Sequence, residues 1–189
     1  MSFDAPRELT DPLTMRALAH PVRLALMRAL NHAGPLTATE AAERVGESPS
    51  NCSFHLRQLA KYGFVEEAEG GSGRRRPWRV VTIGTHFTDV HEDTETALAA
   101  GTLGRVIAER LLERARVGLE QRRLLPKEWR EVTGTSDMTL YVTPEELRAL
   151  DEEIVEILFR YRDRIADPAK RPEGSRPIEY AAFAYPVDL

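Results

Sequence analysis

The region from Thr37 to Gly63 constrains the fold most, because it contains the signals for two helices separated by a very short turn. Thr37 and Glu40 have the spacing of a capping box, in which a threonine caps a helix and a glutamate reaches back to the capping residue. We expect this first helix over residues 38–45 and the turn over residues 46–48. Helix, tight turn and helix is the arrangement that presents a second helix to a DNA groove.

The second helix is expected between residues 48 and 62. Ser48 suits the cap position, Pro49 suits the first helical position, and Gly63 suits the stop. The apolar positions recur at helical spacing and share one side. These positions are Cys52, Leu56 and Leu59.

The other sides of this second helix carry short hydrogen-bonding groups and two cations. Short polar side chains permit close approach to a major groove, and cations reach phosphates or guanine edges. An ordinary amphipathic helix with a solvated polar face is the alternative. The residues expected to contact DNA are Ser48, Ser50, Asn51, Ser53, Phe54, His55, Arg57, Gln58 and Lys61.

A β-hairpin is expected after this helix. Residues 64–68 and 78–83 have strand composition, and the segment between them is rich in glycine. The tip also carries three consecutive arginines, Arg74, Arg75 and Arg76, which we expect to meet a phosphate backbone or a minor groove. A solubilising loop in water is the alternative interpretation.

An earlier helix is expected to begin at Pro21 and to end before Pro35. Two sets of residues then fit patterns of a known family in order and spacing. They are Leu18, His20, Pro21, Arg23, Leu26 and Leu30, and then Ser53, His55, Leu56, Leu59, Gly63 and Val65. Residues 13–83, about two fifths of the chain, resemble the winged helix-turn-helix domain of ArsR-like bacterial transcriptional regulators. The resemblance implies a homodimer on inverted-repeat double-stranded DNA, usually a repressor.

Part of this family senses metals through a Cys-x-Cys pair on the helix before the recognition helix. Here that helix, at residues 40–45, contains no cysteine, and Cys52 is the only cysteine in the chain. A buried lone cysteine usually behaves as a small hydrophobe, with redox sensing as the alternative. His86 and His91 give a second metal alternative, although five-residue spacing does not place them on one helical face. We expect no cofactor and no metal.

Charge is unevenly distributed along the 189 residues, whose formal net charge is −4. Residues 1–84 have a balance of +2 and residues 85–189 a balance of −6, so the acidic part should lie away from DNA. No apolar run has membrane-spanning length, and one cysteine fits a reducing compartment, so we expect a cytoplasmic protein. The chain contains no GxSxG, P-loop, dinucleotide or HExxH motif, and we expect no enzymatic activity.

The C-terminal part is expected to form a second unit, which divides the chain into residues 1–84 and 85–189. A long helix over residues 94–123 should pack on its copy in a dimer, with Ile107 near the centre, and packing within the chain is the alternative. A strand at 138–143, a helix to about residue 164 and a strand at 178–186 should follow. The expected fold class is therefore α+β.

Aromatic residues gather in this C-terminal part. They could line an apolar pocket for a small-molecule effector, and a plain core role is the alternative. They are Trp129, Tyr141, Tyr161, Tyr180, Phe183 and Tyr185.

For the whole chain, a winged-helix protein-interaction module without DNA binding is the alternative function. The cations at both groove-facing sites argue against this alternative.

Overall fold

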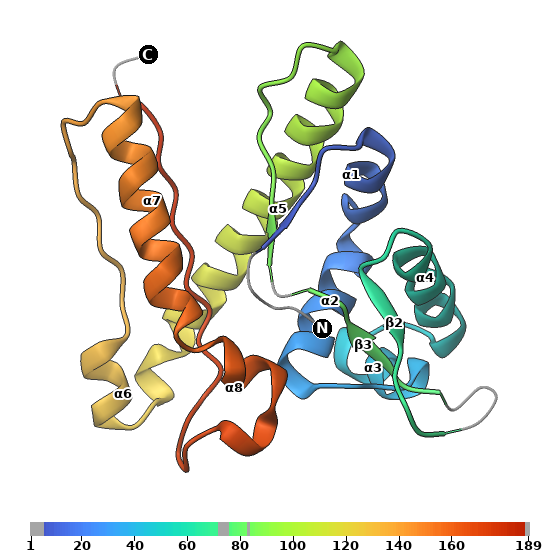
Figure 1. Cartoon of the computed structure of the whole chain (residues 1–189). Helices are drawn as coiled ribbons and strands as arrows, with labels where there is room; N and C mark the ends of the chain where they lie inside the picture. The colour runs from blue at the N-terminus through green and yellow to red at the C-terminus, as the bar shows by residue number, and fades with distance from the viewer. Residues whose placement is uncertain (1–5, 72–75, 83, 188–189) are drawn as a thin grey trace.

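A computed structural model describes residues 6–71, 76–82 and 84–187. Figure 1 shows an N-terminal body of short helices and small sheets, from which the long helix α5 leads to a C-terminal arm. Among the described helices, none combines the length and apolarity needed to cross a membrane. The α+β class, the N-terminal helix-turn-helix and the long helix are all confirmed.

Four helices form the N-terminal body. They are α1 (Pro12–Leu18), α2 (Pro21–Ala33), α3 (Ala38–Val45) and α4 (Pro49–Lys61). The predicted capping box is present, since the Glu40 carboxylate accepts from the Thr37 backbone N–H at 2.8 Å and the Thr37 hydroxyl accepts from the Glu40 N–H at 3.3 Å. Gly46 ends α3 with a φ of 73°, a left-handed conformation that glycine adopts without a steric cost.

Gly63 stops α4 and turns the chain into the hairpin. Its φ is 70°, and the next residue, Phe64, donates its backbone N–H to the Leu59 carbonyl at 3.0 Å. This bond satisfies a carbonyl of the last helical turn, as in other glycine-terminated helices. The Phe64 side chain is fully buried, so the turn also fixes α4 to the core.

The hairpin strands are β2 (Val65–Glu67) and β3 (Trp78–Val80), paired antiparallel with Val65 opposite Val80. Leu36 adds a bridge to Trp78, which attaches the hairpin to the segment between α2 and α3. Both strands are shorter than predicted, and β3 ends where the chain bends after Val80.

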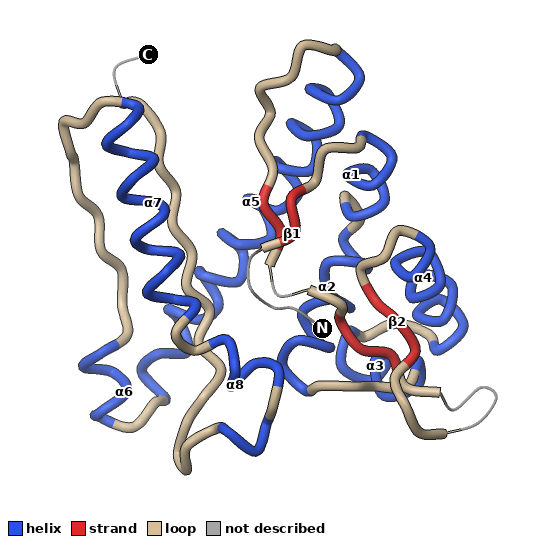
Figure 2. The backbone as a smooth tube through the Cα atoms, in the orientation of Figure 1, coloured by secondary structure: helices blue, strands red, loops and turns tan. Residues whose placement is uncertain are grey.

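A second, parallel pair joins β1 (Arg7–Glu8) to β4 (Thr85–His86), and the sequence analysis did not predict it. Strands of two residues are too short to show an alternating pattern. This pair brings the start of the chain beside the segment that follows the hairpin (Figure 2).

One hydrophobic core spans the N-terminal body and continues into α5 (Thr94–Gln121). Its members on α5 are Ala99, Ala100 and Leu103, all at most 2% exposed. Ile107 packs against the same core. The first part of α5 therefore packs within its own chain, as the alternative interpretation held, while most of the remainder is exposed.

The C-terminal arm contains η2 (Arg122–Leu124), α6 (Lys127–Val132), α7 (Pro144–Phe159), α8 (Arg162–Ala166) and η3 (Pro168–Lys170). The predicted helix start at Thr143 is confirmed by a second capping box with Glu146. The strands predicted at 138–143 and 178–186 are wrong, because both segments are loops. Figure 2 shows them on opposite sides of α7, where neither can pair with the other.

Candidate nucleic-acid interface

Helix α4 has a buried side and a polar side, as its sequence predicted. Cys52, Leu56 and Leu59 are all 0% exposed and fix the helix to the core. The polar side faces solvent at its two ends and in its middle turn. Its exposed members are Ser48, Ser50, Phe54, Arg57 and Lys61, and its half-buried members are Asn51, Ser53 and Gln58.

Hydrogen bonds along α4 orient several of these side chains. The Ser48 hydroxyl caps the helix by accepting from the Asn51 N–H at 3.2 Å, and the Asn51 amide donates to Glu47 at 2.8 Å. Arg57 donates one Nη1 bond to the Ser53 hydroxyl at 2.6 Å. A guanidinium carries five N–H donors, so Arg57 retains donors for another acceptor while it is aligned along the helix.

His55 differs from the other predicted contacts, because it is only 7% exposed. Its ring lies 4.5 Å from the ring of His20, measured between centroids, and its Nδ1 has no hydrogen-bond partner among the described residues. The structure thus gives His55 a packing role, and its contact with DNA stays a prediction.

Burial also lowers the pKa of both His20 and His55. Desolvation lowers the pKa of His20, with further lowering by His55 and Arg23. Desolvation likewise lowers the pKa of His55, followed by the nearby Arg23. Neutral His20 is needed as the cap of α2, since its Nδ1 accepts from the Val22 N–H at 3.2 Å.

The wing is the hairpin of β2 and β3 together with the segment that connects them. Two of its cations are paired with acids of β2. Arg76 contacts Glu67 at 2.7 Å and Arg79 contacts Glu66 at 2.8 Å, all on half-exposed side chains. Exposed ion pairs of this kind contribute little stability, so an arginine can exchange its carboxylate for a phosphate at small cost. Arg74 and Arg75 lie outside the described residues.

Arg7 holds the C-terminal end of α4, which the sequence analysis missed. Its Nη1 donates to the Tyr62 carbonyl at 2.8 Å, and its guanidinium lies 4.7 Å from the centroid of the Phe64 ring. The two partners are more than fifty residues away in sequence, so no local spacing could reveal the contact.

The sequence left Cys52 open as a redox site and His86 with His91 open as a metal site. Burial raises the pKa of the Cys52 thiol, which disfavours the reactive thiolate. His91 makes a 2.8 Å contact with the Thr88 carbonyl, and His86 lies in β4. Within the described ranges, no three His, Cys, Asp or Glu residues gather as a metal site would require.

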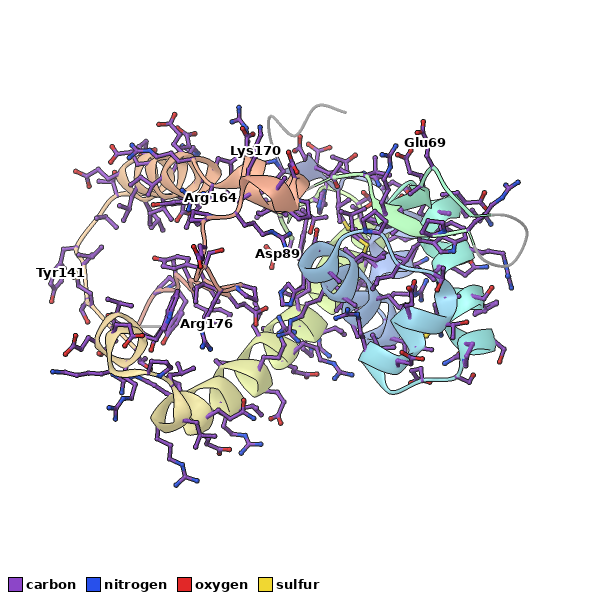
Figure 3. All side chains as sticks on the ribbon, turned by 90° about the horizontal axis from the view of Figure 1, so that it is seen from below. Glu69, Asp89, Tyr141, Arg164, Lys170 and Arg176 are labelled. Carbon is purple, nitrogen blue, oxygen red and sulfur yellow. The ribbon has the colours of Figure 1, made fainter. Side chains whose placement is uncertain are left out.

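The six C-terminal aromatics are not part of the buried core. Tyr141 is 98% exposed and extends into solvent, as Figure 3 shows. Trp129 is half-buried beneath Arg176, at 5.8 Å from guanidinium to ring centroid. None of the six aromatics lines the cavities of about 410 Å³ and about 260 Å³.

Comparison with known protein families matches residues 18–68 to a family described as a helix-turn-helix domain. The match spans α2, α3, α4 and β2, and it stops where the wing tip begins. A search of curated proteins found no match. Domains of this kind are typical of DNA-binding regulators and are not typically enzymatic. The chain thus contains a helix-turn-helix domain over residues 18–68, attached to a helical C-terminal part.

Proposed function

We propose that the chain is a sequence-specific, double-stranded-DNA-binding transcriptional regulator whose α4 enters the major groove. The observation that carries the proposal is the solvent-facing side of α4, where Ser50, Arg57 and Lys61 are exposed on the second helix of a helix-turn-helix domain. The wing would lie on the backbone or in the minor groove, with Arg74 to Arg76 as its contacts. The ArsR-like subtype rests on the sequence resemblance.

The proposed DNA face and the acidic part of the chain lie on different elements. The surplus of positive charge belongs to residues 1–84, and the surplus of negative charge belongs to residues 85–189. In Figure 1 the C-terminal arm extends away from α4 and the hairpin. A duplex placed against α4 would therefore avoid most of the acidic surface.

We propose a homodimer whose contact includes the solvent-facing side of α5. Leu98, Leu112 and Leu119 are spaced by multiples of seven residues and are 65%, 61% and 45% exposed. Seven-residue spacing places them on one helical face, as in paired helices of coiled coils. This face points away from Ile107. Because Ile107 packs against the core of its own chain, we do not propose it as the centre of the interface.

Repression is part of the proposal, since a dimer bound to an inverted-repeat operator would occupy DNA that the transcription machinery needs.

One observation favours a different class of function, a winged-helix protein-interaction module. The carboxylates of Glu66 and Glu67 already pair with Arg79 and Arg76, which lowers the net positive charge of the described wing. DNA binding must therefore be measured directly.

The test is fluorescence anisotropy of the full-length protein on a labelled duplex from the region upstream of its own coding sequence. A scrambled duplex of equal length is the control, at the same salt concentration. We expect tighter binding to the upstream duplex and two protomers per duplex, and a cleavage footprint of the same complex should show protected half-sites about one helical turn apart. Equal, weak binding to both duplexes would favour the protein-interaction module.

A further inference from the structure

A cavity of about 260 Å³ is lined by residues of α2 and α5 together with Glu179 of the C-terminal segment. Part of its lining is apolar and comes from Leu24, Met27 and Ile107. All three are half-buried and pack against the N-terminal core. The cavity therefore has a firm apolar wall that a small organic molecule could contact.

The opposite part of the lining already holds a carboxylate. Arg114 donates to both oxygens of Glu179, with Nε at 3.0 and 2.9 Å and Nη2 at 2.6 Å. Their side chains are 27% and 35% exposed, so the pair is partly shielded from water. This fork shows that the geometry of the cavity suits a planar carboxylate.

Positive charge in the lining exceeds what Glu179 neutralises. Arg28, Arg110 and Arg114 all line the cavity, against the single carboxylate of Glu179. Among the described residues, Arg28 and Arg110 have no ion-pair or hydrogen-bond partner. Two guanidiniums beside an apolar wall thus remain available to an anion that is not part of the chain.

Asn31 adds a polar group without a partner. It lines the same cavity, and its buried Oδ1 has no hydrogen-bond partner in the described structure. Because the oxygen and nitrogen of an amide can exchange places by rotation, Asn31 can offer either a donor or an acceptor to a ligand. Buried polar atoms are normally satisfied, so this one marks a place where a partner is missing.

We propose that this cavity binds a small monocarboxylate with an apolar body. Arg28 and Arg110 hold the carboxylate, and Leu24, Met27 and Ile107 contact the apolar body. Glu179 opposes this binding, because its carboxylate pairs with Arg114 in the same site and would repel a second carboxylate held by Arg28 and Arg110. The binding site goes beyond the proposed DNA function and does not depend on it.

The test uses isothermal titration calorimetry of the full-length protein without DNA, at constant ionic strength. Benzoate and hexanoate are the probes, benzamide and hexanamide are their uncharged controls, and inorganic phosphate is an anion without an apolar body. We expect one benzoate or hexanoate per protomer, and at least tenfold weaker binding of the amides and of phosphate. Binding by neither carboxylate, or phosphate binding as tight as benzoate binding, would overturn the proposal.

Variants locate the site. Arg28→Gln and Arg110→Gln should each weaken carboxylate binding several-fold, while Arg148→Gln, on an exposed arginine of α7 outside the cavity, should leave it unchanged. Glu179→Gln should strengthen binding, because the competing charge is removed. A gain of affinity cannot come from misfolding, so unchanged or weaker binding by Glu179→Gln would contradict the role of Glu179. Since no DNA is present, this result is independent of whether α4 binds an operator.

Discussion

The imidazole rings of His20 and His55 lie 4.5 Å apart between centroids, inclined by 36°, where the start of α2 meets the middle of α4. His20 also caps α2 through its Nδ1. The contact therefore joins α2, which precedes the two helices of the helix-turn-helix pair, to the helix proposed for the major groove. It requires neutral rings, because two protonated imidazoles at this distance would repel each other.

Acid should destabilise the N-terminal body through these two histidines. Both have a pKa below the ordinary value of 6.5, mainly because of desolvation, so the folded protein binds these protons less readily than the unfolded chain. The free energy of unfolding is then highest above pH 6.5 and falls as the pH drops below that value. Urea denaturation at closely spaced pH values between neutral and mildly acidic measures this slope.

The matched control is the double variant His20→Asn, His55→Gln. Asparagine keeps a capping side chain at the start of α2, and neither substitute titrates in this range. A shallower slope is expected, and His32, whose pKa is also lowered mainly by desolvation, contributes to what remains. A variant slope equal to that of the wild type would show that the histidine pair does not cause the acid sensitivity.

Arg57→Ala and Lys61→Ala should weaken operator binding in different ways. If Arg57 reads a guanine, its loss costs about 1–3 kcal/mol and relaxes preference at one base pair. Lys61, at the C-terminal end of α4, should contact a phosphate and weaken binding to all sequences alike. Anisotropy on matched and singly altered duplexes measures both effects, with Arg148→Ala on the exposed surface of α7 as control. Unchanged affinity in both variants would mean that α4 does not bind DNA.

Replacing Arg74, Arg75 and Arg76 together by alanine should reduce the salt dependence of DNA binding. Each phosphate contact that is lost removes about 0.9 from the slope of log affinity against log salt concentration. Glu67→Gln is the opposite change, since it frees Arg76 from its 2.7 Å ion pair and should strengthen binding at low salt. An identical slope in the triple variant would place the wing tip in solvent.

Leu112→Glu should convert the proposed dimer to a monomer. Leu112 is 61% exposed in the single chain, so a glutamate there leaves the fold intact but would be buried without a partner in a paired helix. Light scattering at several protein concentrations measures the change. Val90→Glu, at an 83% exposed site outside the helices, adds the same charge and should leave the mass unchanged. A wild-type monomer would contradict the dimer itself.

A fragment of residues 1–84 should be much less stable than a fragment of residues 1–107. The shorter fragment lacks β4 and the buried residues Ala99, Ala100 and Leu103. Their removal exposes apolar surface on α1 and in the core, and burial of such surface contributes about 25 cal/mol per Å². Circular dichroism melting of the two fragments measures the difference. Equal melting temperatures would place the boundary between the two structural units at residue 84, as the sequence predicted.

Local signals explain most of what the sequence predicted correctly. The capping pairs Thr37–Glu40 and Thr143–Glu146 and the stop at Gly63 act over a few residues, so spacing alone reveals them. The outward and inward sides of α4 follow from helical periodicity in the same way. The burial of His55 was not predicted, because its ring packs on His20, a partner on another helix that periodicity does not show.

Contacts between distant segments explain the remaining differences. Segments 138–143 and 178–186 have strand composition, but composition does not supply a neighbouring strand, and the loops run on opposite sides of α7. The carboxylate cavity depends on Glu179 reaching Arg114 across 65 residues. The spacing of four residues between Arg110 and Arg114 was the only sequence signal for it, and that spacing is common on exposed helices.

The parallel pairing of β1 with β4 affects the order in which this chain can fold during synthesis. Residues 7–8 leave the ribosome early but find their partners at residues 85–86 only after the whole hairpin has followed. The hydrophobic core is complete only when Leu103 of α5 packs into it. Helices α2 to α4 can form as a local unit beforehand, whereas α1 and β1 must wait. A pause in translation between α4 and α5 would therefore leave Met15 and Leu18 of α1 uncovered and open to association with other nascent chains.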